Sequence, residues 1–244
     1  MVAISGTGGV VLAYHDVRPG PPRTAFDVTP EMLATHLWWL RRLGLDIVPL
    51  ARLVAELERG GSGRGMVAIT FDDALAGLHT HGLAVLAAAE ATATVFVVTH
   101  RLGVSPSWWP GAGPTMTSAA LDEVLAAGLD VGSHTRTHPS LPALDDATLA
   151  EELSGSRQAL EDRTGGAVTM LAYPDGHHDE RVRLAVARSG YRAGFTFLNG
   201  RISRRDDRYR LPRLTMGHHH RTPRLLAHLL RPARTWPDTQ LASA

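Results

Sequence analysis

The sequence Met66-Val67-Ala68-Ile69-Thr70-Phe71-Asp72-Asp73 joins a short apolar run to two adjacent carboxylates. A mainly apolar run of this length, with Thr70 as its one polar residue, is typical of a strand buried inside a parallel sheet. Glycines at 60, 61 and 63 indicate a loop before it, and the alanine-rich residues 81–90 after it favour a helix. Residues 66–71 are therefore predicted to form a buried strand that is followed by a helix.

The same alternation of strand and helix continues on both sides of this unit. Further strands are predicted at 10–14, 47–50, 94–98, 129–132, 168–172, 191–197 and 209–214. Helices are predicted at 30–43, 51–59, 118–127, 145–163 and 179–189, with Ser118 and Asp145 or Asp146 as capping residues. The connections are too long for hairpins, which favours parallel strands. About seven such units predict an α/β fold with a closed or nearly closed barrel, and residues 1–244 are expected to form one domain.

The composition excludes several chemistries. The chain has 244 residues, enough to bury a sizeable core, and it contains no cysteine. Its 25 basic residues are all arginine. Thiol nucleophiles, zinc fingers and iron–sulfur clusters are therefore excluded, as are lysine Schiff bases and the P-loop lysine. Thirteen histidines remain as the inventory for metal binding and proton transfer.

The formal net charge of +1 hides an asymmetry, because residues 1–180 carry −10 and residues 181–244 carry +11. The basic part is expected to fold against acidic helices, and contact with an anionic surface through the helical segment 218–244 is the alternative. Leu225 and Leu229 lie on one face of that segment, which favours packing against the barrel over binding to a membrane. No apolar run is long enough to span a membrane, and no secretory signal is visible, so a cytoplasmic location is expected. Nucleic-acid binding is not expected, because no reading motif is present.

Polar side chains cluster where three of the predicted strands end. These clusters are Asp72-Asp73, residues 133–138 with His134 and His138, and residues 173–178. Taken alone, the carboxylates could cap a helix and the two histidines could be a surface pair. Together, one Asp and two His suit a divalent ion such as zinc, cobalt or nickel, and the second Asp could accept a proton from bound water.

These three clusters resemble, in order and context, motifs of the polysaccharide deacetylase family with NodB homology, carbohydrate esterase family 4. The matching stretches are 70–73, 133–139 and 173–176, and residues 11–16 resemble the first strand of a subgroup with an N-terminal extension. The resemblance implies a distorted (β/α)7-type barrel with parallel strands. It also implies metal-dependent removal of acetyl groups from sugars.

The resemblance also implies roles for individual residues. Asp73, His134 and His138 would bind the divalent metal, with zinc the first expectation, and Asp72 would be the general base. The backbone N–H of Asp175 would stabilise the oxyanion. Two departures matter: Ala172 and Asp175 stand where the family usually has Arg and Tyr.

The departures leave some roles to be filled by other residues. Arg213 is the candidate to orient the base, and a structural ion pair is its alternative. The general acid is sought among the remaining histidines, namely His177, His178 and His218 to His220, of which His178 is selected. Trp108, Trp109 and Tyr173 are candidates for substrate contact, and the tryptophans could equally form a lid or a core plug.

The leading hypothesis is a metal-dependent hydrolase that removes acetyl from an N-acetylated amino sugar or a small molecule containing one. An amidohydrolase of a non-sugar C–N bond in a biosynthetic pathway is the first alternative. A catalytically silent sugar-binding module is the second, although retention of Asp72 and all three ligands argues against it.

Overall fold

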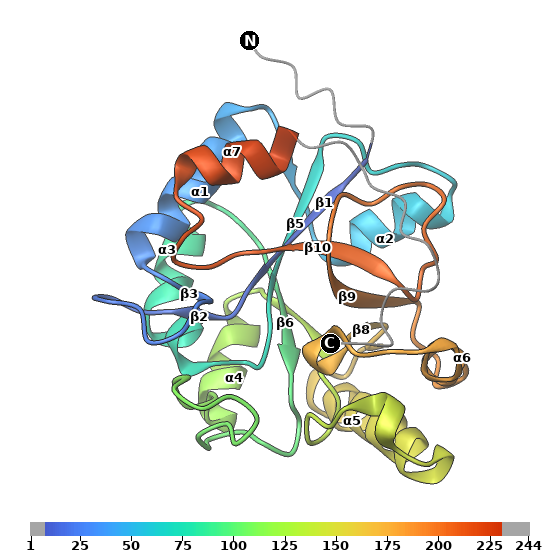
Figure 1. The fold of residues 1–244 in the computed structure, drawn as a ribbon. Helices are drawn as coiled ribbons and strands as arrows, with labels where there is room; N and C mark the ends of the chain where they lie inside the picture. Colours follow the sequence, from blue (N-terminus) through green and yellow to red (C-terminus); the bar gives the residue numbers. More distant parts are fainter. Residues whose placement is uncertain (1–7, 231–244) are drawn as a thin grey trace.

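The structure is a computed structural model that describes residues 8–230 (Figure 1). Its strands are β1 (Val10–Tyr14), β2 (Asp16–Val17), β3 (Asp27–Val28), β4 (Asp46–Ile47), β5 (Met66–Phe71), β6 (Thr94–Val97), β7 (Asp130–Ser133), β8 (Met170–Ala172), β9 (Ala193–Asn199) and β10 (Leu211–Thr215). Its α-helices are α1 (Pro30–Arg42), α2 (Leu50–Glu58), α3 (Leu83–Ala88), α4 (Ser118–Ala126), α5 (Asp146–Thr164), α6 (Glu180–Arg188) and α7 (Thr222–Leu230). Short helical turns span Leu78–Gly82, Leu141–Ala143 and Pro174–Gly176.

Seven parallel strands close into a barrel in the order β1-β10-β9-β8-β7-β6-β5, and β5 pairs with β1 to complete the ring. One edge of β5 pairs with β1 from Val67 to Phe71. Its other edge is shared, because β4 pairs with Met66 and Val67 while β6 pairs with Thr70 and Phe71. The predicted α/β barrel of parallel strands is confirmed, and its distortion includes a register shift between β9 and β10.

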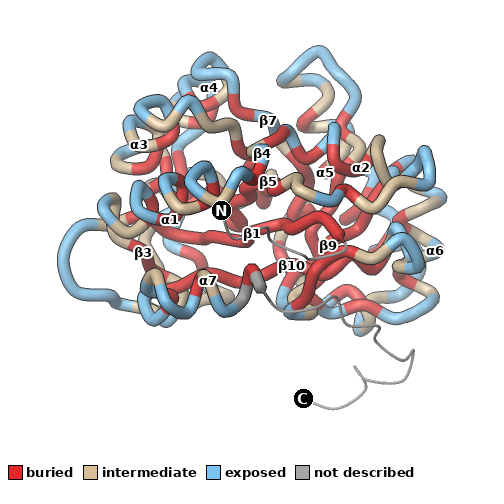
Figure 2. The backbone as a smooth tube through the Cα atoms, turned by 90° about the horizontal axis from the view of Figure 1, so that it is seen from above, coloured by how far each residue is buried: buried red, intermediate tan, exposed pale blue. Residues whose placement is uncertain are grey.

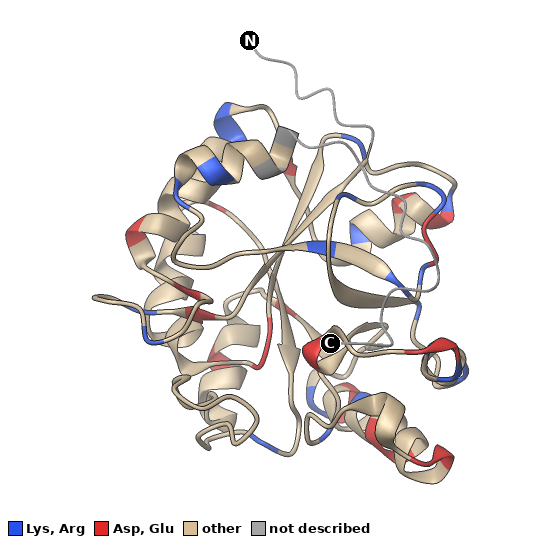
Figure 3. Ribbon diagram, viewed as in Figure 1, with Lys and Arg blue, Asp and Glu red and all other residues tan. Residues whose placement is uncertain are grey.

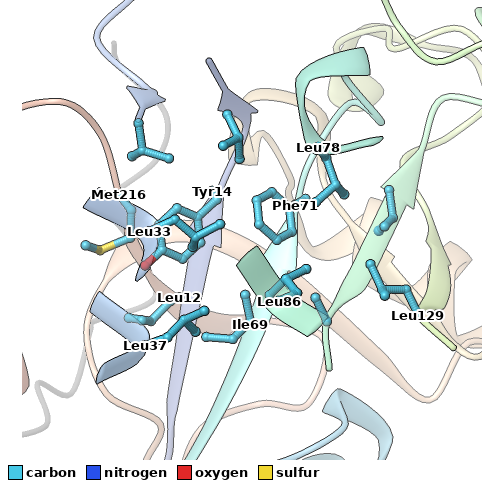
Figure 4. Packing of buried hydrophobic residues seen from close by; sticks show 14 of the residues in the cluster. Leu12, Tyr14, Leu33, Leu37, Ile69, Phe71, Leu78, Leu86, Leu129 and Met216 are labelled. Atoms are coloured by element: carbon cyan, nitrogen blue, oxygen red, sulfur yellow. The ribbon is translucent and has the colours of Figure 1, made fainter. Parts of the chain in front are cut away.

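Side chains of most barrel strands alternate between two hydrophobic clusters, and Leu171 of β8 belongs to a third. Leu12 and Ile69 belong to a large cluster that α1, α3 and α4 cover, shown in Figure 4. Ala68 and Leu211 belong to a second cluster, together with Phe96 and Phe195 from other strands. Since successive strand residues point to opposite faces, Asp72 and Arg213 follow the direction of this second cluster. The barrel strands are buried over most of their length, and exposed strand residues such as Asp130 and Asn199 lie at strand ends. Most exposed residues lie on the surrounding helices and loops (Figure 2).

Helix boundaries follow local capping chemistry. The Thr29 and Asp145 side chains accept hydrogen bonds from backbone N–H groups at the starts of α1 and α5, and Asp145 is one of the two expected caps. The predicted cap Ser118 is wrong by one residue, because Thr117 accepts the bond from Ala120 N. The helix expected over 81–90 starts earlier, with a π-helical turn from Leu78 that leads into α3.

Arginines of the basic part pair with carboxylates elsewhere in the chain. Figure 3 marks where the arginines and the acidic residues lie along the ribbon. Arg181 contacts Asp146 of α5, Arg192 contacts Glu58 of α2, and Arg213 contacts Asp72. These pairs agree with the expectation that the basic part folds against acidic elements of the same chain.

The helix α7 packs against the barrel. Leu225 and Leu229 are fully buried in the same cluster as Leu33 and Leu37 of α1, as the apolar face of the segment predicts. Arg201, itself buried, donates hydrogen bonds to the carbonyls of Leu229 and Gly8. The remainder of the segment, residues 231–244, lies outside the described residues. Within residues 8–230, no helix is both long and apolar enough to cross a membrane.

Candidate metal centre and active site

The predicted site residues come together at the carboxyl ends of the strands. Asp72 and Asp73 follow β5, and His134 follows β7. Asp73 and His134 line a cavity of about 310 Å³. The cavity is lined by His15, Phe26, Asp73, Trp108, Trp109, His134, His138, Asp175 and Phe197. This is the end of a parallel barrel at which ligands generally bind.

Unusual backbone turns aim the metal-ligand candidates into the cavity. Asp73 and Ala74 have φ angles of 64° and 51°, and His138 has a φ of 63°. Non-glycine residues seldom adopt these angles, so the surrounding structure must hold them. The N–H of Met116 donates to the carbonyl of Ala74 at 2.7 Å, which fixes the first turn.

Glu152 of α5 holds the loop that carries the two histidines. Its carboxylate accepts hydrogen bonds from the N–H groups of Arg136 and Thr137, at 2.8 and 3.0 Å, and from the Thr137 hydroxyl at 2.6 Å. His138 N donates to Thr135 Oγ1 at 3.1 Å within the same loop. The sequence-based prediction missed Glu152, because it is one of several acidic residues on a largely polar helix and no local signal distinguishes it.

The ligand atoms of Asp73, His134 and His138 converge. One atom from each lies within 4.8 Å of the others. Asp73 Oδ1 is 3.8 Å from His134 Nε2 and 3.6 Å from His138 Nε2. The Nδ1–H of His134 donates to the carbonyl of Ala172 at 2.8 Å, which leaves its Nε2 lone pair free to bind an ion.

The electrostatics of this group suit a divalent cation. Burial lowers the pKa of His134 to about 4, and burial together with the charge of His134 lowers the pKa of His138 to about 3. Both rings are therefore neutral at pH 7, as metal binding requires. Burial and the neighbouring Asp72 charge raise the pKa of Asp73 to about 7. A carboxylate with two neutral imidazoles is a donor set for first-row divalent ions, so the residues present fit such a metal.

Asp72 is held by Arg213 in a fully buried, two-point ion pair. Arg213 Nη1 and Nη2 each donate to one Asp72 oxygen at 2.7 Å, and both side chains are 0% exposed. The guanidinium also donates to the carbonyl of Thr196 at 3.1 Å and stands over the ring of Phe96. Although burial alone would raise the pKa of Asp72, the charge and hydrogen bonds of Arg213 outweigh it and hold the pKa well below its usual value.

The third motif forms a tight turn after β8. Asp175 has a φ of 54°, and its carboxylate is exposed at the cavity. Gly176 follows with a φ of 70°, and a Cβ there would lie 2.8 Å from the backbone nitrogen of Phe197. Glycine is therefore required at this position of the turn.

Aromatic rings form the remaining wall of the cavity. The His15 imidazole is stacked between Phe26 and Phe197, with centroid distances of 4.8 and 5.7 Å, and Trp109 meets it edge-on at 5.1 Å. His15 Nδ1 is buried and has no hydrogen-bond partner among the described residues. The sequence-based search for a proton donor overlooked His15, although it directly follows β1 in the quoted segment 11–16.

Two predicted residues lie outside the cavity. Tyr173 is fully buried, and its hydroxyl donates to the carbonyl of Tyr209 at 2.7 Å. His178 stacks on Tyr173, and its Nδ1 bonds the carbonyl of Gly176. Tyr173 follows the inward-facing Ala172 and therefore points to the opposite side of the sheet. A substrate contact for Tyr173 and a proton-donor role for His178 do not fit these positions.

The other histidines that were candidates for the general acid also lie outside the cavity. His177 is exposed and contacts Ser140, and His218 contacts the carbonyl of Ala25. None of His177, His218, His219 or His220 lines the cavity.

The fold is thus a closed parallel barrel that carries an Asp-His-His group and a second carboxylate at its carboxyl end, a donor set that fits a divalent ion. The family model described as polysaccharide deacetylase matches residues 59–194, more than half of the chain. The chain therefore belongs to the polysaccharide deacetylase family.

Relatives and solved structures extend this result. The poly-beta-1,6-N-acetyl-D-glucosamine N-deacetylase of Staphylococcus epidermidis is 25% identical over 228 residues, covering 84% of this chain and 78% of that protein. The deacetylase PplD of Streptococcus pyogenes, solved in complex with acetate, superposes with a TM-score of 0.79 at 21% identity, covering 90% of this chain and 97% of PplD. IcaB of Ammonifex degensii superposes with a TM-score of 0.77 at 23% identity, covering 93% of this chain and 98% of IcaB. At these identities the two solved structures establish the shared fold.

Proposed function

We propose that this protein is a divalent-metal-dependent deacetylase that removes the acetyl group from an N-acetylated amino sugar. The observation that carries the proposal is the convergence of Asp73, His134 and His138 beside the Asp72–Arg213 pair. The S. epidermidis relative is named for deacetylation of a polymer of N-acetylglucosamine, which supports an amino-sugar substrate.

The proposed metal would be held by Asp73, His134 and His138, with zinc as the first expectation and cobalt or nickel as alternatives. When bound, such an ion supplies a more acidic water and polarises the acetyl carbonyl. Asp72 is the proposed general base. Its ion pair with Arg213 keeps it ionised, and therefore able to accept a proton, throughout the neutral pH range.

The chain offers two further groups for the reaction. We infer that the backbone N–H of Asp175, in the turn beside the cavity, donates to the oxyanion. His15 is the cavity histidine outside the ligand group, and we assign it to protonation of the leaving amine. Because burial lowers the pKa of His15 to about 4, we expect its protonation to depend on negative charge developing on the substrate.

The test is acetate release from a panel of N-acetylated sugars and N-acetylated non-sugar amines, with added Zn²⁺ or Co²⁺ and with a chelator. Asp72→Asn should keep one bound ion but lose turnover by about 10²–10⁴-fold, the usual contribution of a general base. His134→Ala should lose both the ion and the activity, because it removes a ligand.

Asp130→Asn is the matched control, because Asp130 is an exposed carboxylate at the opposite end of the barrel and should leave both properties unchanged. Full activity in chelator, or a parental rate for Asp72→Asn, would contradict the proposal. Release of acetate only from non-sugar amides would overturn the sugar assignment, and metal binding without any acetate release would indicate a silent module.

A further inference from the structure

Trp108 contacts two of the three candidate metal ligands. Its indole Nε1–H donates to Asp73 Oδ1 at 2.9 Å. Its ring lies nearly parallel to the imidazole of His138, with a centroid distance of 4.8 Å and an interplanar angle of 17°. One side chain therefore fixes both the carboxylate and an imidazole of the same group.

The hydrogen bond reaches the carboxylate oxygen that faces the imidazoles. Asp73 Oδ1 is also the atom that lies 3.6 Å from His138 Nε2 and 3.8 Å from His134 Nε2. These distances are too long for direct hydrogen bonds. A carboxylate oxygen has two lone-pair directions, so one can accept the indole N–H while the other points to an ion. Because Asp73 is only 3% exposed, bulk water has little access to replace the indole as its partner.

The loop that carries Trp108 is fastened to the turn that carries Asp73. Gly103 N donates to Met116 O at 2.7 Å and closes the base of the loop. The returning end of the loop then bonds the segment after Asp73, through Met116 N to Ala74 O at 2.7 Å and Ala76 N to Pro114 O at 2.8 Å. The indole and the carboxylate are therefore parts of one hydrogen-bonded unit.

The neighbouring tryptophan has a different environment. Trp109 packs edge-on against His15 and Phe26, with centroid distances of 5.1 and 5.5 Å. The two adjacent tryptophans line the same cavity, but the contacts described for Trp109 are with the aromatic wall.

We propose that Trp108 is a positioning residue of the metal centre, which orients Asp73 and His138 and so increases the affinity for the divalent ion. The inference rests on the proposed function in that it takes the Asp-His-His group to bind a metal. Mutation of a residue that hydrogen-bonds to a metal ligand usually lowers the metal affinity by 10–100-fold.

The test uses Trp108→Phe, which removes the N–H and keeps a ring, and Trp108→Leu, which removes both contacts. Affinities of the metal-free protein for Zn²⁺ and Co²⁺ are measured by competition with a chromophoric chelator, and the visible absorption of the Co²⁺ form is recorded. We expect Trp108→Phe to weaken binding by about 10-fold or more and to change the Co²⁺ spectrum. Trp108→Leu should weaken it further.

Trp109→Phe is the control and should leave the affinity within about twofold of the parent, since Trp109 is described against the aromatic wall. Thermal melting in chelator checks that each variant is folded before metal is added. An unchanged Zn²⁺ affinity in both folded Trp108 variants would overturn the inference while leaving the proposed function intact. A parent protein that binds no divalent ion would overturn both.

Discussion

Arg213 neutralises a carboxylate that has no access to water. Asp72 and Arg213 are both completely buried, so each depends on the other for its charged state. The planar guanidinium suits this role because it donates two parallel hydrogen bonds to one carboxylate. Lysine at the same position would keep the charge but not the two-point geometry.

Arg213→Lys should therefore raise the pKa of Asp72, because a weaker ion pair no longer outweighs the effect of burial. A base with a raised pKa is protonated at higher pH, so the acidic limb of kcat/KM should move to higher pH and kcat should fall by about 10-fold or more. The measurement is the pH–rate profile in saturating metal.

Arg192→Lys is the control, because Arg192 pairs with Glu58 at the surface and should leave the profile unchanged. An acidic limb that stays in place for Arg213→Lys would show that Arg213 does not control the ionisation of Asp72.

Single residues differ in how far the sequence predicts them. Asp73, His134 and His138 lie in short local motifs at strand ends, so the strand pattern was enough to bring them together. The contact of Trp108 with Asp73 joins residues 35 positions apart through an irregular loop, and no periodicity indicates it. Tyr173 was misplaced because one step along a strand reverses the side-chain direction.

At the scale of elements, α7 packs against α1 with its apolar face. The sequence showed its apolar face but not its partner, because nothing local states which surface an amphipathic helix will cover. The structure places Leu225 and Leu229 in the main core. The short strands β2 and β3 were missed because two-residue strands carry no periodic signal.

Leu229→Ala should lower the free energy of unfolding by about 2–5 kcal/mol, as expected when a buried leucine is truncated in a packed core. Urea denaturation followed by circular dichroism measures the change. Arg224→Ala on the exposed face of the same helix should stay within about 0.5 kcal/mol of the parent. Equal stabilities of the two variants would mean that α7 does not contribute to the core.

At the scale of the whole molecule, four buried histidines make stability depend on pH. Burial lowers the pKa of His15, His36 and His134 to about 4 and that of His138 to about 3. Between about pH 6.5 and pH 4 the unfolded chain binds protons that the folded protein does not. The raised pKa values of Asp73, Asp16, Asp130 and Asp206 act in the opposite direction. The lowered pKa values of His178 and Asp72 act in the same direction as those of the four histidines.

The free energy of unfolding of the metal-free protein should therefore fall as the pH is lowered from 6.5 towards 4. Each histidine adds up to about 1.4 kcal/mol per pH unit. His36→Gln should reduce this slope by about one such increment, whereas His100→Gln at an exposed position should not. Urea titrations in chelator across this range provide the measurement, and a pH-independent unfolding free energy would refute the argument.

The closure of the ring has a consequence for how the chain is made. The first barrel strand, β1, lies between β5 and β10, so the circle is complete only when residues 211–215 have been synthesised. The ligand residues 73, 134 and 138 all leave the ribosome earlier, whereas the partner of Asp72 is 141 positions downstream of it. A nascent chain thus acquires the proposed metal-ligand residues before it can hold the proposed base in its charged form, and we expect activity to arise only with the last strand.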